Sequence, residues 1–250
     1  MHKKALPLLA FIALMFATAI VACAQGETPA KTAAPGSTPA AITASSTPTD
    51  LARAALAAHG GDKFKSIKSQ VVTGTVNFYA PGVPQPIPGK FSMTTAGDKA
   101  RFDMDASPMM VFTQIFDGKK LYSSSPAVPL PPPDKFGLNV LGKYDQSGYT
   151  VTALPDDKKL RGFSIADAQG NTTKYYIDPA SARVMRYVFD FGGYTFENEN
   201  KKFKDVEGVL GLAAYTVKIE TPQGAFLAEY SVKDIKLNST LADAVFVIPN

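Results

Sequence analysis

The residues best suited to chemistry are few in this chain of 250 residues: one cysteine, Cys23, and two histidines, His2 and His59. A single cysteine forms no disulfide within the chain and no thiolate metal cluster. Two histidines, one of them at the second residue, cannot supply a zinc or iron site built from several imidazoles. We therefore expect no metal site and no cofactor.

Two carboxylates and His59 remain as candidates for acid–base chemistry. Asp103 and Asp105 lie two residues apart on a predicted strand, so they share one face of it. Such a pair on an alternating strand usually faces solvent, and we interpret it in that way. His59 ends a predicted helix, where we expect it to cap or pack. Because the sequence also has no Gly-x-Ser-x-Gly elbow and no Gly-rich phosphate loop, we predict a protein that is not an enzyme.

The N-terminus has the pattern of a secretory signal peptide over residues 1–22. Lys3 and Lys4 precede the apolar run Ala5–Ala22. Ile20-Val21-Ala22-Cys23 resembles a bacterial lipobox, with Ile20 in place of the usual Leu, and lipidation would then fall on Cys23. The same residues also fit a small-x-small cleavage site, which would release a soluble protein beginning at Gln25. We predict export to the periplasm, with outer-membrane anchoring if Cys23 is lipidated.

A low-complexity stretch over residues 23–47 predicts a disordered linker. Of the 24 residues from Gly26 to Thr49, 19 are Ala, Pro, Ser or Thr, so this stretch cannot bury enough apolar surface to fold. A spacer of this kind suits a domain anchored to a surface, which favours the lipoprotein interpretation. The alternative is a dispensable low-complexity tail.

Residues 48–250 are predicted to form one mainly β domain. A helix begins with Thr47 as its N-cap and ends at Gly60-Gly61. Ten to eleven β-rich runs follow, punctuated by Gly, Pro and Asp, as in an antiparallel meander. We expect a curved antiparallel sheet that forms an incomplete β-barrel, or half-barrel, with the N-terminal helix and a short lid helix within Phe136–Tyr144. The proline-rich loop Ser125–Asp134 interrupts the strands and exposes Val128 and Leu130.

Apolar residues alternate along the first predicted strands, and several methionines cluster among them in one region. Flexible thioethers suit an adaptable ligand surface, although Met and Phe on alternating strands are more often plain core. We predict that Met109-Met110 is the part most clearly suited to a ligand. The candidate ligand-binding residues are Leu56, Val76, Phe78, Phe91, Met93, Phe102, Met104, Met109, Met110 and Phe112.

The order of several short motifs resembles the LolA/LolB-like superfamily of outer-membrane lipoprotein-sorting proteins. These motifs are Ala57-Ala58-His59-Gly60-Gly61, Phe116-Asp117-Gly118-Lys119-Lys120, Tyr175-Tyr176-Ile177-Asp178-Pro179 and the segment 230–249. The resemblance covers most of residues 48–250 and implies a half-barrel that binds lipoprotein acyl chains or related ligands without catalysis. Val209-Leu210-Gly211 departs from the family pattern, in which an aromatic residue precedes a proline.

We therefore expect a non-enzymatic, monomeric envelope protein that binds a lipid, a lipoprotein acyl chain or a similar apolar ligand. The alternative is an envelope sensor or assembly protein that uses the same barrel to bind a protein partner. The predicted exposure of Val128 and Leu130 suggests this alternative. Nucleic acid is not expected, because 26 Lys and Arg nearly balance 22 Asp and Glu and no basic run occurs.

Intact mass spectrometry of protein made with its own signal peptide tests the N-terminal prediction. A denatured mass that begins at Cys23 and includes acyl groups is the expected result. A mass that begins at Gln25 would instead establish a soluble periplasmic protein.

Overall fold

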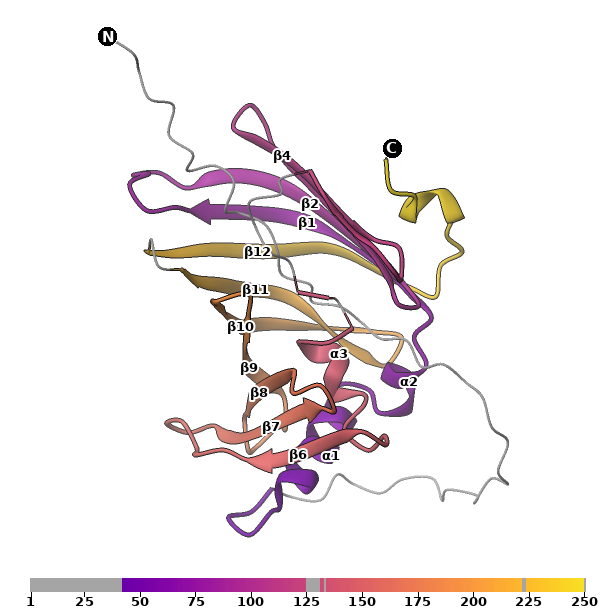
Figure 1. Cartoon of the computed structure of the whole chain (residues 1–250). Coiled ribbons are helices and arrows are strands. Elements are labelled where there is room, and N and C mark those ends of the chain that lie inside the picture. The colour runs from indigo at the N-terminus through magenta and orange to yellow at the C-terminus, as the bar shows by residue number, and fades with distance from the viewer. Residues whose placement is uncertain (1–41, 125–130, 133, 222–223, 250) are drawn as a thin grey trace.

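One antiparallel sheet makes up most of the molecule (Figure 1). The computed structural model describes residues 42–124, 131–132, 134–221 and 224–249. Within these residues the strand order is β5-β4-β3-β2-β1-β12-β11-β10-β9-β8-β7-β6, with β5 and β6 at opposite, unpaired edges. The predicted fold class is confirmed, because the sheet curves without closing into a barrel.

The twelve strands exceed the ten to eleven that were expected. Their bounds are β1 (Ser69–Tyr79), β2 (Ile87–Ala96), β3 (Lys99–Ala106), β4 (Met110–Phe116), β5 (Leu121–Ser123), β6 (Tyr149–Ala153), β7 (Arg161–Asp167), β8 (Thr172–Ile177), β9 (Val184–Phe191), β10 (Tyr194–Val206), β11 (Val209–Thr221) and β12 (Gly224–Leu237).

The β10–β11 hairpin is longer than the sequence pattern indicates. The sequence pattern alone indicates strands over Tyr194–Glu199 and Leu212–Thr221, but in the structure β10 and β11 extend to a tight turn between Val206 and Val209. The extra part of β10 is rich in lysine, and pairing with β11 holds it in place even though it lacks an apolar alternation.

Helix α1 (Pro48–Ala58) begins where its capping residues require. The Thr47 hydroxyl accepts from the Asp50 N–H at 3.2 Å, and the Asp50 carboxylate accepts from the Thr47 N–H at 3.1 Å, which is a capping box. Leu51, Ala52, Ala55 and Leu56 are buried, and the helix packs against β6 and β7.

Three shorter helical turns occur among the described residues. Helix α2 (Asp62–Lys65) directly follows α1, and α3 (Leu138–Leu141) occupies the segment predicted as a short lid helix or loop. A 3-10 turn, η2 (Asp243–Phe246), contacts β3. Figure 1 shows α1 and α3 toward the β6–β9 end of the sheet, whereas α2 lies beside the β10–β11 turn, where the Lys63 Nζ donates to the Glu207 carbonyl at 3.1 Å. No helix among the residues described is both long and apolar enough to cross a membrane.

Some predictions concern residues that the structure does not describe. The signal peptide 1–22, Cys23, most of the linker 23–47, and both Val128 and Leu130 lie outside the described residues. The last part of the predicted linker is described: residues 43–46 form a turn in which the Ser46 N–H donates to the Thr43 carbonyl at 3.1 Å.

His59 ties the end of α1 to two strands. Its ring is fully buried, and Nε2 accepts from the Val184 N–H of β9 at 3.1 Å. The proton must therefore be on Nδ1, which lies 3.3 Å from the Leu210 carbonyl of β11. The Leu210 N–H donates in turn to the His59 carbonyl at 3.3 Å. The expectation that His59 packs or caps is confirmed.

We predict that His59 makes folding sensitive to mild acid. Burial lowers the pKa of His59 from 6.5 to about 4; the hydrogen bond with the Leu210 carbonyl opposes this effect, and the nearby Arg183 adds to it. The unfolded chain thus takes up a proton below pH 6.5, whereas the folded protein does so only below about pH 4. The free energy of unfolding should therefore fall as the pH drops through this window, by about 3 kcal/mol in total.

Urea unfolding of the wild type and of His59→Gln between pH 7 and pH 4 measures this effect. Other groups titrate alike in both proteins, so the difference in slope isolates His59, whatever the absolute stability of the variant. Parallel pH profiles would contradict the prediction.

Candidate functional site

The first four strands place a block of apolar side chains on the concave face of the sheet. Register pairs Val72 with Met93, and Met93 in turn with Phe102. One row further along, Phe91 pairs with Met104, which pairs with Phe112. Directly paired residues share a face, so the candidates predicted on β1–β4 face the same side.

These side chains are packed closely in the structure. Val76, Phe78, Phe91, Met93, Phe102, Met104 and Phe112 are between 1% and 4% exposed. Phe91 meets Tyr230 of β12 edge to face at 5.1 Å between ring centroids, and Phe102 tilts against Phe112 at 6.3 Å. We call this set the apolar block.

Three predicted ligand residues lie outside the apolar block. Leu56 is buried on α1, which packs against β6 and β7 at the other end of the sheet. Met110 starts β4 at the rim of the block and is half-buried. Met109 stands in the β3–β4 turn and is 49% exposed, which makes it a surface residue in this structure.

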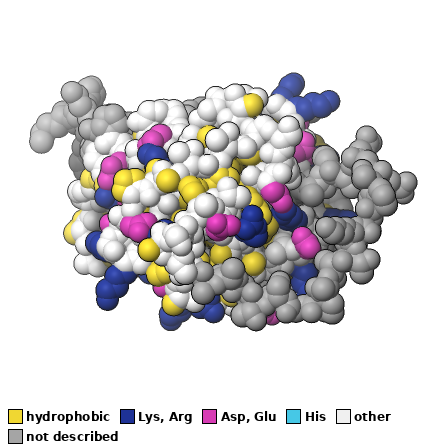
Figure 2. Space-filling model, turned by 90° about the horizontal axis from the view of Figure 1, so that it is seen from below, with side chains coloured by type: hydrophobic (Ala, Val, Ile, Leu, Met, Phe, Trp, Pro, Cys, Tyr) yellow, Lys and Arg dark blue, Asp and Glu magenta, His cyan; other side chains and the backbone are white. Residues whose placement is uncertain are grey.

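The described helices do not share the sheet equally. Helix α1 packs against β6 and β7, and in Figure 1 α1 and α3 lie on the β6–β11 side of the sheet, away from strands β2–β4. Seen from below, hydrophobic side chains gather along the middle of the molecule, among Lys, Arg, Asp and Glu that alternate in sign (Figure 2). Neither sign of charge forms a continuous patch on this face.

A small cavity lies where the sheet forks. Strands β11 and β12 pair only from Ala214–Ser231 to Thr221–Gly224, and beyond that point β11 follows β10 while β12 follows β1. The stacked rings of Tyr215 and Tyr230, 4.7 Å apart, sit beside the point of separation.

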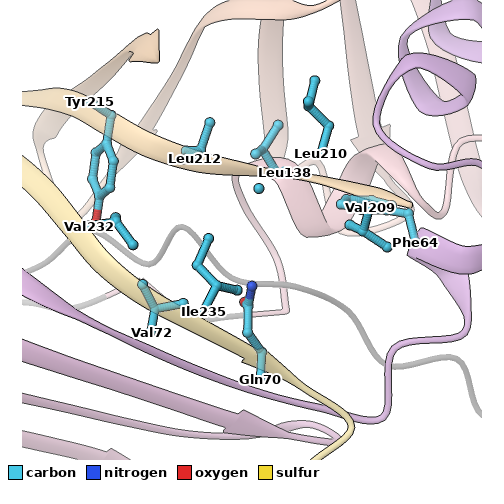
Figure 3. Close-up of a pocket in the computed structure, with 11 residues that line it drawn as sticks. Phe64, Gln70, Val72, Leu138, Val209, Leu210, Leu212, Tyr215, Val232 and Ile235 are labelled. Carbon is cyan, nitrogen blue, oxygen red and sulfur yellow. The ribbon is translucent and has the colours of Figure 1, made fainter. Parts of the chain in front are cut away.

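Both arms of the fork line this cavity (Figure 3). Its walls are Phe64, Gln70, Val72, Leu138, Val209, Leu210, Gly211, Leu212, Tyr215, Val232 and Ile235. The volume is about 30 Å³, which holds a water molecule but not an acyl chain. The unusual Val209-Leu210-Gly211 segment forms one wall, and a Cβ on Gly211 would lie 2.7 Å from Ile235. Gly211 therefore lets the two arms approach each other.

The middle of the concave face is polar as well as aromatic. Asn198 donates to Asn200 at 3.2 Å, and Asn200 donates to the Val184 carbonyl at 2.7 Å. Tyr187 pairs in register with Asn198, and both are fully buried. Within the described chain, the Tyr187 hydroxyl and the Asn198 Oδ1 have no hydrogen-bond partner. Burial raises the pKa of Tyr187 far above its ordinary value, so this hydroxyl stays protonated.

The carboxylates considered for acid–base chemistry lie on the opposite, convex face. Asp103 accepts from Arg101 at 2.6 Å and from Thr113 at 2.9 Å, and Asp105 accepts from Ser107. Both face away from the apolar block, as an alternating strand requires. Among the described residues no group of three or more His, Cys, Asp or Glu side chains could hold a metal ion.

Two matched variants test which buried hydroxyl contributes to stability. Tyr175→Phe removes an O–H that donates to the Gly137 carbonyl at 2.6 Å, and should lower the free energy of unfolding by about 1 kcal/mol. Tyr187→Phe removes a hydroxyl that has no partner in the described chain, and should leave stability unchanged or raise it. Urea unfolding compares them; an equal loss in both would show that the Tyr187 hydroxyl is satisfied in solution.

No protein-family model and no curated protein sequence matches this chain. Several solved structures are similar to this chain. A LolA superfamily protein from Nitrosomonas europaea is 12% identical, with 82% of this chain and 99% of that chain covered and a TM-score of 0.56. A DUF1329 family protein from Desulfovibrio piger is 9% identical, with coverage of 81% and 98% and a TM-score of 0.48. A domain from Vibrio parahaemolyticus, provisionally named as an outer membrane lipoprotein-sorting protein domain, is 11% identical, with coverage of 79% and 94% and a TM-score of 0.45. The chain therefore has the fold of a LolA superfamily protein, as the sequence motifs implied.

Proposed function

We propose that this protein is a non-enzymatic envelope protein that holds an acyl chain against the apolar block of β1–β4. The observation that carries this proposal is the block itself: Val76, Phe91, Met93, Phe102 and their neighbours form one concave apolar surface on the part of the sheet that α1 does not cover. The fold supports it, because a curved open sheet can enclose an apolar ligand.

The size of the block suits one extended chain. From Val72 to Phe78 the face runs for about 20 Å along β1, and from β1 to β4 it spans about 14 Å across the sheet. Each methylene buried there contributes about 0.8 kcal/mol. Met93 and Met104 lie in the middle of the surface, where flexible thioethers can adjust to chains that differ in shape.

Binding must open space in this face. The cavity at the fork is too small for such a chain, and the side chains of the apolar block are closely packed. We infer that side chains of the block move apart when a ligand enters, and that the strands beneath them stay paired.

Export and anchoring belong to the same proposal. The charged and apolar residues 1–22 support secretion, and the lipobox-like sequence at Cys23 supports attachment to a membrane through a lipid, with 23–47 as the spacer. The proposed ligand is a lipid or lipoprotein acyl chain, and we propose that the protein binds it as a monomer.

Titration with cis-parinaric acid, a fluorescent fatty acid, tests acyl-chain binding. Phe112→Ala removes a buried ring from the block and should weaken binding about tenfold. Val111→Ala changes the neighbouring residue on the same strand, which is 67% exposed on the convex face, and should bind like the wild type.

Thermal unfolding of the variants separates lost affinity from lost structure. Because Phe112 is buried in the ligand-free protein, its truncation should also lower the free energy of unfolding by about 3–5 kcal/mol, so binding is compared at a temperature where the variant remains folded. A wild-type protein that neither binds the probe nor copurifies with lipid in native mass spectrometry would refute the proposed function.

A further inference from the structure

Gln114 is a polar side chain in the middle of an apolar surface. It lies on β4, in register with Phe102 of β3 and Ser123 of β5, so its side chain faces the apolar block. Along the strand its same-face neighbours are Phe112 and Phe116. The residue is 0% exposed, and neither Nε2 nor Oε1 has a hydrogen-bond partner in the described chain.

An amide buried in this way is costly and needs an explanation. A glutamine offers two N–H donors and one carbonyl acceptor, and all of them lose water on burial. Buried polar groups in native proteins are nearly always paired, with protein, water or a ligand. A water here would find few polar partners. Among the same-face neighbours of Gln114, in register and along the strand, only Ser123 carries a polar side chain.

The missing partner must be electrically neutral. The charged residues of β3, among them Arg101 and Asp103, occupy the alternate positions and pair with each other on the convex face. Strands β4 and β5 carry no charged residue. A phosphate or a carboxylate beside Gln114 would thus be desolvated without a counter-charge from these strands.

We propose that Gln114 recognises the polar end of the acyl ligand through two hydrogen bonds, one from Nε2 to a carbonyl oxygen and one to Oε1 from an adjacent N–H or O–H. This inference rests on the proposed function and narrows it. The ligand class is an acyl chain that ends in an amide or in a protonated carboxylic acid. An ester supplies only acceptors and leaves Oε1 unpaired.

Competition against bound cis-parinaric acid compares dodecanamide, dodecanoic acid and methyl dodecanoate, which share a chain and differ at the head. In the wild type, dodecanamide should displace the probe at about 3–10-fold lower concentration than the ester, as one added hydrogen bond predicts. Dodecanoic acid should match the amide at low pH and weaken as it ionises. If the protein prefers the amide over both the ester and the acid, the ligand is an N-acyl compound. That result and an equal preference for the amide and the protonated acid both support the proposal.

Gln114→Met keeps the size of the side chain and removes both polar atoms. It should abolish the preference for amide over ester and raise the melting temperature of the ligand-free protein, since it removes an unpaired buried amide. Val111→Met, on the convex face of the same strand, should keep the preference.

Each other outcome overturns the assignment. Equal binding of amide and ester by the wild type, which needs no variant, refutes the role of Gln114 and leaves acyl-chain binding intact. A preference that survives in Gln114→Met does the same. Failure of the wild type to bind any of these compounds or the probe refutes this inference together with the proposed function.

Discussion

Strand register is the constraint on which the rest of this structure depends. In an antiparallel sheet, paired residues share a face, so alternate residues of ten neighbouring strands build one continuous concave surface, from Phe112 on β4 to Phe163 on β7. The sheet does not close, and this apolar surface therefore needs a cover. Helices α1 and α3 cover the β6–β9 end, where His59 fixes the end of α1 through Val184 and Leu210. Under the proposed function, that asymmetry leaves the β1–β4 end as the place for the acyl chain.

The two ends of the concave face also differ in chemistry. Towards β8–β10, Tyr175, Asn200 and His59 make directional hydrogen bonds to backbone groups, which favour one arrangement of the interior. Towards β2–β4, contacts of Met93, Met104 and the phenylalanines are non-directional, and their rearrangement breaks no hydrogen bond. The Tyr215–Tyr230 stack stands between the two regions, beside the fork of β11 and β12. A rigid end can thus hold the fold while the other end adapts.

Sequence patterns predicted the parts of the fold that depend on local rules. Thr47 and Asp50 predicted the start of α1, and the alternation of Phe91, Met93, Phe102 and Met104 predicted an apolar face on each strand, without indicating which face of the sheet is concave. The β10–β11 hairpin was predicted too short, because pairing between strands, and not apolar alternation, holds its lysine-rich part. Whether Met109 reaches the interior depended on where the β3–β4 hairpin turns, and alternation cannot locate that turn to a single residue.

Gln114 shows what local rules contain and what they omit. In the run Phe112-Thr113-Gln114-Ile115-Phe116 the alternation already directs Gln114 to the same side as both phenylalanines, so its orientation follows from the sequence. Its burial and lack of a partner do not, because they depend on strands β3 and β5 that flank it. Considered for stability alone, this position favours an apolar side chain, as at Phe112. We therefore attribute this exception to the proposed ligand, whose polar end would both donate and accept a hydrogen bond at Gln114.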